Sequence, residues 1–542
     1  MYPILSAVGL LAVYALIRVP LNRRRRALDD VHALPGPAAS IASWIWGHEL
    51  LVFQHAATEM YSIWAHSFGG LFKIKGALFH PDIIVATDHA AVHHIFAHSD
   101  RYVKSPAFRP PIINLLGAGL VWSEGEDWHR QRKILSPAFS QESVKDMTSV
   151  IFECAERLET RLTNLILDSP SKDGASLNIV HYISACTLDI IGAVGLSHSF
   201  SAQTARVDPH SDAAQISASW ADHVNTGLQP LAFLAPLVVR AVPAITRAPL
   251  PLMQTQGVVK TIVRRLGTAL LEREQFAFTA AASQSAPGGA RVAREDGAQA
   301  ARGKDILSVL LRARRLGKAD QALSDGQILD NISTFTMVGH ETTAGSLTFT
   351  LWELARHPAV QDRLRAEIQS CGRDLSYDDI QKLEFLDAVV KEGLRLHPAS
   401  PQTERLALED DVVPLSTALP GIGGSFRIRK GQVIHLPFMT MNTDTKVWGP
   451  DAKVFDPTRW LVARDPATLP SGWSGLLTFC DGPRNCIGWR LAVLEFKIIL
   501  ATVVRAVVLL DTGVRVEEKI SPTLQPVVDG KGGVLPLRVR LV

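Results

Sequence analysis

The fold of this chain is decided by residues 479–488, whose sequence is FCDGPRNCIG. A loop rich in glycine and proline places Cys486 directly before an apolar segment that we predict to be helical over residues 488–510. Unpaired N–H groups and the positive end of the helix dipole stabilise a thiolate there. A lone cysteine is more often a buried small hydrophobe, and Cys480 is interpreted in this way. A thiolate held as in the loop around Cys486 can serve as an axial iron ligand.

The same ten residues resemble F-x-x-G-x-R-x-C-x-G, the haem-binding loop of the cytochromes P-450. The resemblance implies a mainly α fold with small β-sheets, in which one large haem domain follows an N-terminal membrane anchor. It implies heme b (iron protoporphyrin IX) as the cofactor, with the Cys486 thiolate as the axial ligand of the haem iron. Arg484 would pair with a haem propionate.

Three further residues match the family's structural motifs. Glu392 and Arg395 resemble its E-x-x-R pair, and Arg459, in a segment similar to P-x-R-F/W, would close a cluster with them. Thr458 stands where a glutamate is usual. The i, i+3 spacing of Glu392 and Arg395 alone suggests a surface ion pair on a helix. The resemblance implies a structural role on the haem's proximal side.

Residues 338–343, VGHETT, resemble the [AG]-G-x-[DE]-T-[TS] motif of the family's long I helix. The resemblance implies that Glu341 and Thr342 are catalytic and deliver protons. A threonine hydroxyl can bond back to the i−4 carbonyl and loosen the helix. The alternative is that both threonines are satisfied inside a core helix. Val338 departs from the usual Ala or Gly and is expected to narrow the groove above the iron.

Three more residues are assigned to cofactor binding. Trp128 and Arg132 match the family's W-x-x-x-R, whose spacing puts two hydrogen-bond donors on one helix face. Arg405 falls where the family often has another propionate-binding arginine. For each arginine the alternative is a solvated helix residue.

The N-terminus predicts a membrane anchor. Residues 2–21 are largely apolar and long enough to span a bilayer, and residues 23–26 are all arginine. The positive charges follow the apolar stretch, whereas those of a cleaved signal peptide precede it, so an uncleaved anchor is favoured. Positively charged flanks stay on the cytosolic side of the membrane, so the body is expected to be cytosolic. We therefore expect an anchor (1–21), a basic and Pro-rich linker (22–40), and a catalytic domain (41–542). The expected location is the endoplasmic reticulum membrane, with a single pass.

Composition excludes several other classes of protein. The 542 residues are 47% hydrophobic and 20% charged. The formal charge is +3, and the arginines at 23–26 alone contribute four positive charges, so the rest of the chain has a net charge of −1. A near-neutral body argues against nucleic acid as a partner. Five cysteines are too few, and an odd number, for a disulfide framework. The chain has no phosphate-loop, dinucleotide-binding or G-x-S-x-G motif.

Local patterns predict several further elements. Ser324 with Gln327 forms a capping box that opens a helix over residues 325–356, and Ser376 with Asp379 opens another that ends near His397. Short strands are expected at residues 426–428 and 432–436. Residues 279–304 read as a solvated loop inside the body.

The resemblance implies a haem-thiolate monooxygenase similar to fungal microsomal members, with a role in secondary metabolism. Electrons would come from NADPH through a separate flavoprotein reductase, with cytochrome b5 as a further candidate donor. The chain lacks its own flavin or nicotinamide motif. The alternatives are a haem-thiolate isomerase or dehydratase acting on a peroxide, which typically loses the acid–threonine pair, and a non-catalytic haem-binding membrane protein.

The substrate is expected to be a lipophilic small molecule, because the positions that line the family's pocket are mostly apolar here. They are Phe108, Leu115, Leu116, Phe233, Leu234, Phe335 and residues 399–402. The apolar, proline-rich stretch 228–253 is expected to touch the membrane and guard an access channel.

Overall fold

The computed structural model describes residues 30–542, apart from 106–107, 172, 205–207, 243–256, 258–259, 273–305, 316–321, 373 and 466–468. The predicted anchor (1–21) and the predicted solvated loop (279–304) lie outside the described residues, as does the second half of the stretch 228–253.

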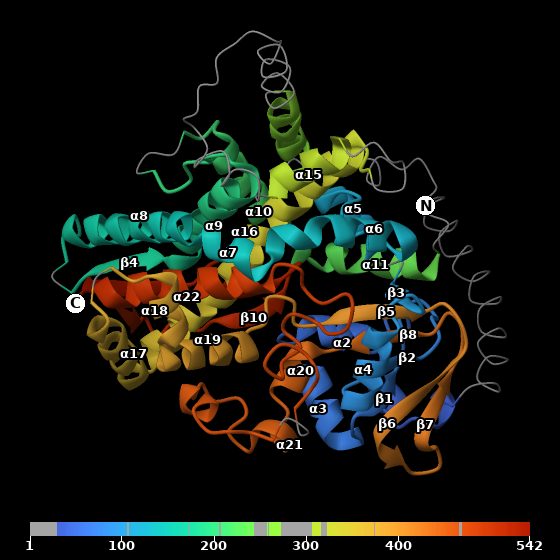
Figure 1. The fold of residues 1–542 in the computed structure, drawn as a ribbon. Coiled ribbons are helices and arrows are strands. Elements are labelled where there is room, and N and C mark those ends of the chain that lie inside the picture. Colours follow the sequence, from blue (N-terminus) through green and yellow to red (C-terminus); the bar gives the residue numbers. More distant parts are fainter. Residues whose placement is uncertain are drawn as a thin grey trace, which may run out of the picture.

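Helices form most of the described chain (Figure 1). In chain order they are α2 (Glu49–Gln54), α3 (Glu59–Phe68), α4 (His89–Ala97), α5 (Arg109–Leu116), α6 (Gly125–Leu135), α7 (Gln141–Asp146), α8 (Thr148–Leu167), α9 (Ile179–Leu196), α10 (Asp212–Gly227), α11 (Pro230–Ala241), α15 (Ile306–Arg315), α16 (Asp325–Arg356), α17 (Pro358–Ser370), α18 (Tyr377–Lys382), α19 (Glu384–Leu396), α20 (Phe438–Asn442), α21 (Thr445–Trp448) and α22 (Trp489–Ala506). Short 3-10 turns include η1 (Val31–Ala33), η2 (Ala39–Ile41), η3 (Ser136–Phe139) and η5 (Pro457–Trp460).

The strands form small sheets, as predicted. One has the order β1 (Leu71–Ile74), β2 (Ile83–Ala86), β8 (Val433–Leu436), β5 (Thr403–Ala407), β3 (Tyr102–Lys104). The others are β10 (Glu517–Ile520), β11 (Leu524–Val528), β12 (Lys531–Gly532); β4 (Ala175–Asn178), β13 (Pro536–Leu541), β9 (Val507–Asp511); and the hairpin β6 (Asp411–Leu419), β7 (Gly423–Ile428). Among the described strands, β2 and β8 pair in parallel and the other pairs are antiparallel. The expectation of a mainly α fold with small sheets is therefore confirmed.

Helix α16 runs through the centre of the helical body, and the five-stranded sheet lies to one side of that body with α3 and α4 (Figure 1). Helix α16 has the predicted bounds and begins at the predicted capping box of Ser324 and Gln327. Buried side chains lie on all faces of this helix, which is typical of a helix that crosses a core. Gly339 permits a close approach of α9, because a Cβ at Gly339 would lie 2.6 Å from the Ile191 side chain.

The prediction of one helix from Ser376 to His397 is wrong, because the chain forms two helices that are separated at Leu383. The Ser376–Asp379 capping box opens α18, but Leu383 is extended and a second helix, α19, follows. The carboxylate of Glu367, from α17, accepts the backbone N–H groups of Phe385 and Leu386, both at 2.8 Å. This cap at the first turn of α19 comes from another helix, so the local pattern did not reveal it.

The C-terminal helix is shorter than predicted. Helix α22 ends at Ala506, and the next residues form β9, which pairs with β13 near the end of the chain. The β-branched residues Val507 and Val508 suit a strand, and the ladder with β13 satisfies their backbone groups.

Two contacts fix the N-terminal residues to the body. Part of the predicted linker packs against it, since Val31 and Leu34 are buried with the five-stranded sheet and the Pro35 carbonyl accepts the Lys73 N–H at 2.9 Å. The buried Arg240 of α11 forms ion pairs with Glu49 of α2 and with Glu404 of β5, the latter at 3.4 Å. We call these three residues the Arg240 clasp.

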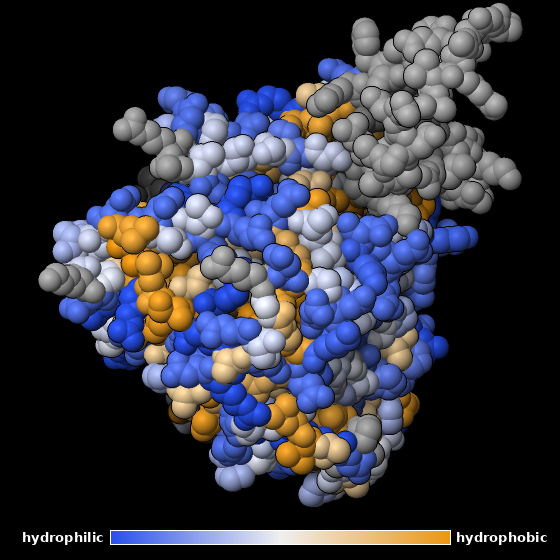
Figure 2. All heavy atoms as spheres, turned by 60° about the vertical axis from the view of Figure 1, so that its left-hand side comes forward, coloured by the Kyte–Doolittle hydropathy of each residue, from blue (hydrophilic) through white to orange (hydrophobic). Residues whose placement is uncertain are grey.

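Among the described helices, α9 is long and apolar enough to cross a membrane. Most of it is buried inside the protein, as in a core helix. Figure 2 shows one largely hydrophilic face, with apolar side chains in separate patches.

Candidate active site

The loop before α22 holds Cys486 by its backbone. The Cys486 N–H donates to the Phe479 carbonyl at 2.8 Å. Gly482 has a φ of +67°, and a Cβ there would lie 2.5 Å from the Phe96 carbonyl oxygen, so a side chain would be excluded. Helix α22 begins three residues after Cys486, at Trp489. The turn therefore fixes the sulfur next to a helix N-terminus, as the sequence predicts.

The Cys486 side chain is exposed, although the protein around it desolvates the thiol. Burial raises the pKa of Cys486 to about 11, against the opposing effects of the Gly488 N–H and of Arg132. A coordinated metal would deprotonate such a thiol. Cys480, in contrast, packs against the apolar cluster of the five-stranded sheet, as interpreted from the sequence.

A buried group of cations lies beside this loop. Arg484 stacks over the Trp128 ring at 4.4 Å and forms an ion pair with Glu124, while Lys104 Nζ lies 3.4 Å from the Glu124 carboxylate. Arg405 is buried on β5, next to the β3 strand that carries Lys104. Burial lowers the pKa of Lys104 to about 7, and Arg484 and Arg405 act in the same direction while Glu124 opposes them.

This group, which we call the cation cluster (Lys104, Arg405, Arg484 and their partner Glu124), contains more positive than negative charge. Buried cations without counter-charges are costly. The guanidinium Nε of Arg484 also lacks a hydrogen-bond partner among the described residues. The cluster therefore fits a ligand that carries carboxylates.

Arg132 lies on the Cys486 side of the loop. Its two terminal nitrogens donate to the carbonyl oxygen and the side-chain oxygen of Asn485, at 2.7 and 2.8 Å. The sequence assigned Arg132 to the same propionates as Arg405 and Arg484. In the structure its hydrogen bonds hold the neighbour of Cys486.

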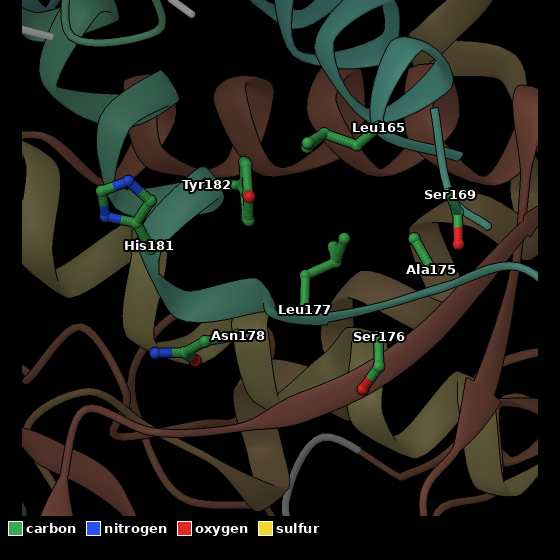
Figure 3. A pocket seen from close by; sticks show the side chains of 8 residues that line it. All are labelled: Leu165, Ser169, Ala175, Ser176, Leu177, Asn178, His181 and Tyr182. Atoms are coloured by element: carbon green, nitrogen blue, oxygen red, sulfur yellow. The ribbon is translucent and has the colours of Figure 1, made fainter. Parts of the chain in front are cut away.

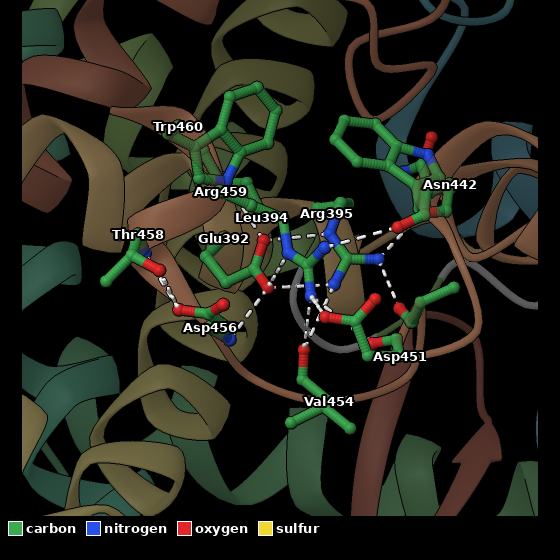
Figure 4. A network of polar contacts seen from close by, with 12 residues as sticks. Glu392, Leu394, Arg395, Asn442, Asp451, Val454, Asp456, Thr458, Arg459 and Trp460 are labelled. Carbon is green, nitrogen blue, oxygen red and sulfur yellow. Dashed lines mark hydrogen bonds and ion pairs between the residues drawn. The ribbon is translucent and has the colours of Figure 1, made fainter. Parts of the chain in front are cut away.

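Glu392, Arg395 and Arg459 meet in a buried network (Figure 4). Arg395 donates to both carboxylate oxygens of Glu392 at 2.8 Å, and Arg459 Nε donates to Oε1 at 2.8 Å. Trp460 Nε1 donates to the other oxygen at 2.9 Å. The surface ion pair that spacing alone suggests is therefore wrong. At the unusual position 458, the threonine hydroxyl bonds to Asp456.

In the middle of α16, Val338, Gly339, Thr342 and Gly345 are not fully buried. Val338, Thr342 and Gly345 form a partly open stripe on one helix face, and Gly339 packs against Ile191 of α9. The Thr342 hydroxyl donates to the Val338 carbonyl at 2.7 Å, the i−4 bond expected from the sequence, and the helix is continuous here. Glu341 is buried and accepts a hydrogen bond from Ser184 of α9 at 2.8 Å.

Comparison with known proteins agrees with this arrangement. The Cytochrome P450 family model matches residues 37–523. The chain belongs to the cytochrome P450 family. Cytochrome P450 monooxygenase 205 of Postia placenta is 30% identical, over 89% of this chain and 86% of the relative. Cytochrome P450 monooxygenase claO of Ampulloclitocybe clavipes is 32% identical, over 96% and 95% respectively. The chain is thus a monooxygenase similar to fungal relatives.

The cytochrome P450 family implies a haem with a cysteine thiolate as its axial ligand, and the residues here fit that group. Cys486 lies just before α22, and the cation cluster contains more positive than negative charge. When bound, haem supplies the oxygen chemistry, and the thiolate favours O–O cleavage.

The residues predicted to line the substrate pocket of this cytochrome P450 differ in their contacts and burial. Phe233 stacks on Phe53 at 4.8 Å and meets the Trp46 ring edge-on, so it supports packing between α11 and the N-terminal region. Phe335 is buried against Phe139 at 5.5 Å. Phe108 is exposed.

A surface pocket elsewhere on this cytochrome P450 contains none of the predicted site residues (Figure 3). It lies between the end of α8, β4 and the start of α9, and is lined by Leu165, Ser169, Ala175, Ser176, Leu177, Asn178, His181 and Tyr182.

Sequence reasoning missed Lys104, Glu124, Ser184 and His340 as neighbours of the site. A single charge or hydroxyl in a strand or helix gives no local signal. For His340 the signal was its place inside the VGHETT motif.

Proposed function

We propose that this cytochrome P450 inserts one oxygen atom of O₂ into a lipophilic small molecule, with NADPH-derived electrons from a separate membrane flavoprotein reductase. The observation that supports it most is the position of Cys486, desolvated at the start of α22 and beside a cation cluster that fits haem carboxylates. The reduced, CO-bound absorption spectrum tests the thiolate. NADPH-driven turnover with added reductase tests the reaction.

The proposed roles follow from these contacts. Cys486 would ligate the haem iron, and Arg405, Arg484 and Trp128 would hold the haem carboxylates. Arg132 would keep Asn485, and through it the Cys486 loop, in place. Glu341 and Thr342 would be the catalytic residues. Thr342, on the partly open stripe of α16, would hold a proton-carrying water, and Glu341 would supply protons to it.

Replacing Thr342 by alanine is expected to leave haem binding intact and divert reduced oxygen to hydrogen peroxide, because the hydroxyl that orders the proton path is lost. The measurement is peroxide formed per NADPH consumed. Thr350→Ala is a matched control, since Thr350 makes the same i−4 bond, to Ser346 at 2.9 Å. Native-like coupling in Thr342→Ala would contradict the proposed role.

We further propose a location in the endoplasmic reticulum membrane, anchored by residues 1–21, with the body on the cytosolic side. Apolar side chains near α11 support a second membrane contact. Trp44 is 79% exposed and packs edge-on against Phe79, and Ile41 nearby in sequence is also exposed. Aromatic side chains of this kind suit the membrane interface.

In a chain that lacks the anchor, Trp44→Asp and Leu234→Glu are expected to reduce binding to phospholipid vesicles, because each removes apolar surface from the contact. Co-sedimentation with vesicles measures this. The control is Leu167→Asp, an exposed apolar residue at the end of α8, on the other side of the molecule from α11 (Figure 1). Equal binding by all variants would refute this contact.

A further inference from the structure

The segment 116–120, where α5 ends and the connection to α6 begins, is held by three side chains of α16. Asp330 Oδ2 and Asn331 Oδ1 each accept a backbone N–H from the segment, at 2.9 and 3.0 Å. The Thr334 hydroxyl donates to a backbone carbonyl of the segment at 3.1 Å. The backbone partners are, in the same order, Ala118, Leu120 and Leu116. We call Asp330, Asn331 and Thr334 the loop clamp.

Two glycines in this segment allow the backbone to approach α16 so closely. Gly117 has a φ of +87°, and a Cβ there would lie 2.6 Å from Asp330 Oδ1. A Cβ at Gly119 would lie 2.5 Å from the Thr334 hydroxyl oxygen. A side chain at either position would push the backbone away from α16. The glycines and the loop clamp therefore form one contact, in which the bare backbone fits against polar side chains.

This contact lies on the face of α16 that carries the partly open stripe. Asn331, Thr334 and Val338 follow one another at i, i+3 and i+7, a spacing that places side chains on one helix face. Asn331 and Thr334 are fully buried, whereas Val338 and Thr342 are not. The segment 116–120 therefore covers this face of α16 on the N-terminal side of the stripe.

The loop clamp matters for α5 because this helix has few features of its own to fix it. It has only eight residues, with two prolines in its first turn, and no side chain caps its start. Isolated helices of this length are not stable in water, so tertiary contacts must hold it. Leu116 belongs both to α5 and to the clamped segment. Leu116 and its neighbour Leu115 are among the residues predicted to line the substrate pocket.

We propose that the loop clamp positions the end of α5 and thereby determines which lipophilic molecules this cytochrome P450 accepts. By holding the backbone of the segment 116–120, it keeps Leu115 and Leu116 in place beside the open face of α16. A bulky apolar ligand that fills the space above Thr342 contacts this fixed wall, whereas a small ligand does not. The inference rests on the proposed function, because it takes the substrate to lie above the stripe.

The first test measures the loop clamp without any substrate. Hydrogen–deuterium exchange is followed by mass spectrometry in peptides that cover residues 112–122 of the full-length, haem-loaded protein. Asp330→Ala removes the acceptor of the Ala118 N–H, and we expect several-fold faster exchange in these peptides. Asp330→Asn keeps a side-chain oxygen that can accept the same N–H, so it should retain most of the protection.

Two results of the exchange measurement would overturn the loop clamp. One is native protection in Asp330→Ala. The other is equally fast exchange in Asp330→Asn and Asp330→Ala, since the charge of Asp330 would then matter and its hydrogen bond would not. Arg264 is the cation that faces this charge, at 3.9 Å from Oδ1.

The second test concerns ligand selection, with imidazole and clotrimazole as probes. Both azoles bind haem iron through a ring nitrogen, but clotrimazole is bulky and apolar. We expect Thr334→Val to raise the spectral dissociation constant of clotrimazole several-fold and to leave that of imidazole unchanged, and Thr334→Ser to restore clotrimazole binding. The matched control is Thr336→Val, which should leave both constants unchanged. Thr336 is equally buried, but its hydroxyl bonds to the Ile332 carbonyl of its own helix at 2.8 Å.

The outcomes of this titration separate the inference from the proposed function. Equal weakening of both azoles by Thr334→Val, or an equal effect of Thr336→Val, would overturn the role in ligand selection. Native binding of both azoles by Asp330→Ala and Thr334→Val would overturn it as well. A native protein without the red-shifted CO-bound band would instead overturn the proposed haem-thiolate function.

Asn331 is kept unchanged in these tests because it also holds a second helix. Its side-chain nitrogen donates to Gln131 of α6 at 2.9 Å. Helix α6 carries Trp128 and Arg132, so a change at Asn331 would disturb the cofactor site together with the segment 116–120. Asp330 and Thr334 allow the loop clamp to be weakened without that second effect.

Discussion

Cys486→Ala should abolish the red-shifted Soret band of the reduced, CO-bound protein, whereas Cys480→Ala should keep it. The Cys486 N–H is held by the Phe479 carbonyl just before α22, and the loss of this cysteine would remove the proposed axial ligand. Cys480 is six residues earlier in the same loop but packs against the sheet's apolar cluster, so its replacement would leave the proposed axial ligand in place.

The measurement is the difference spectrum of each purified full-length variant, normalised to total haem. Haem content should fall in Cys486→Ala without vanishing, because the cation cluster still offers partners to the carboxylates. Equal loss of the band in both cysteine variants would show that the wrong sulfur has been assigned.

Glu392→Ala should prevent stable folding or strongly lower the unfolding temperature of the protein. Glu392 accepts hydrogen bonds from Arg395, Arg459, Trp460 and the Asp456 N–H in a fully buried site. Its removal leaves the buried Arg395 without a carboxylate partner, and it leaves Arg459 with only the half-exposed Asp451. Breaking a buried ion pair in this way costs about 3–5 kcal/mol. Typical total stabilities are only about 5–15 kcal/mol.

Thermal unfolding and soluble yield measure this effect. Glu384→Ala is the control on the same helix, because Glu384 is exposed in the first turn of α19 and its loss should cost a few tenths of a kcal/mol. An unfolding temperature for Glu392→Ala within a few degrees of the control would show that the network does not stabilise the fold.

The sequence predicts those parts of this molecule whose signals are local. The capping box at Ser324 gave the start of α16, and the loop around Gly482 placed Cys486 before α22, because each depends on residues close together in the chain. The Glu392 cluster was also expected, although only the resemblance to a family brought Arg459 into it.

Other features depend on partners far away in sequence and were missed for that reason. The break at Leu383 is fixed by Glu367 of the preceding helix, and β9 forms because β13 lies beside it. Lys104 and Glu124 join the site through the meeting of β3, β5 and the start of α6. No hydrophobic periodicity and no sequence motif indicates these contacts.

The Arg240 clasp has a consequence for protein engineering. Its three charges come from the N-terminal region, the middle and the C-terminal half of the chain, and all three are buried. A chimera that exchanges the first hundred residues with a relative keeps Arg240 and Glu404 but draws residue 49 from a different parent. Crossovers between positions 49 and 240 therefore require a donor with an acidic residue at the equivalent place, and libraries built without this rule should lose many of their members to misfolding.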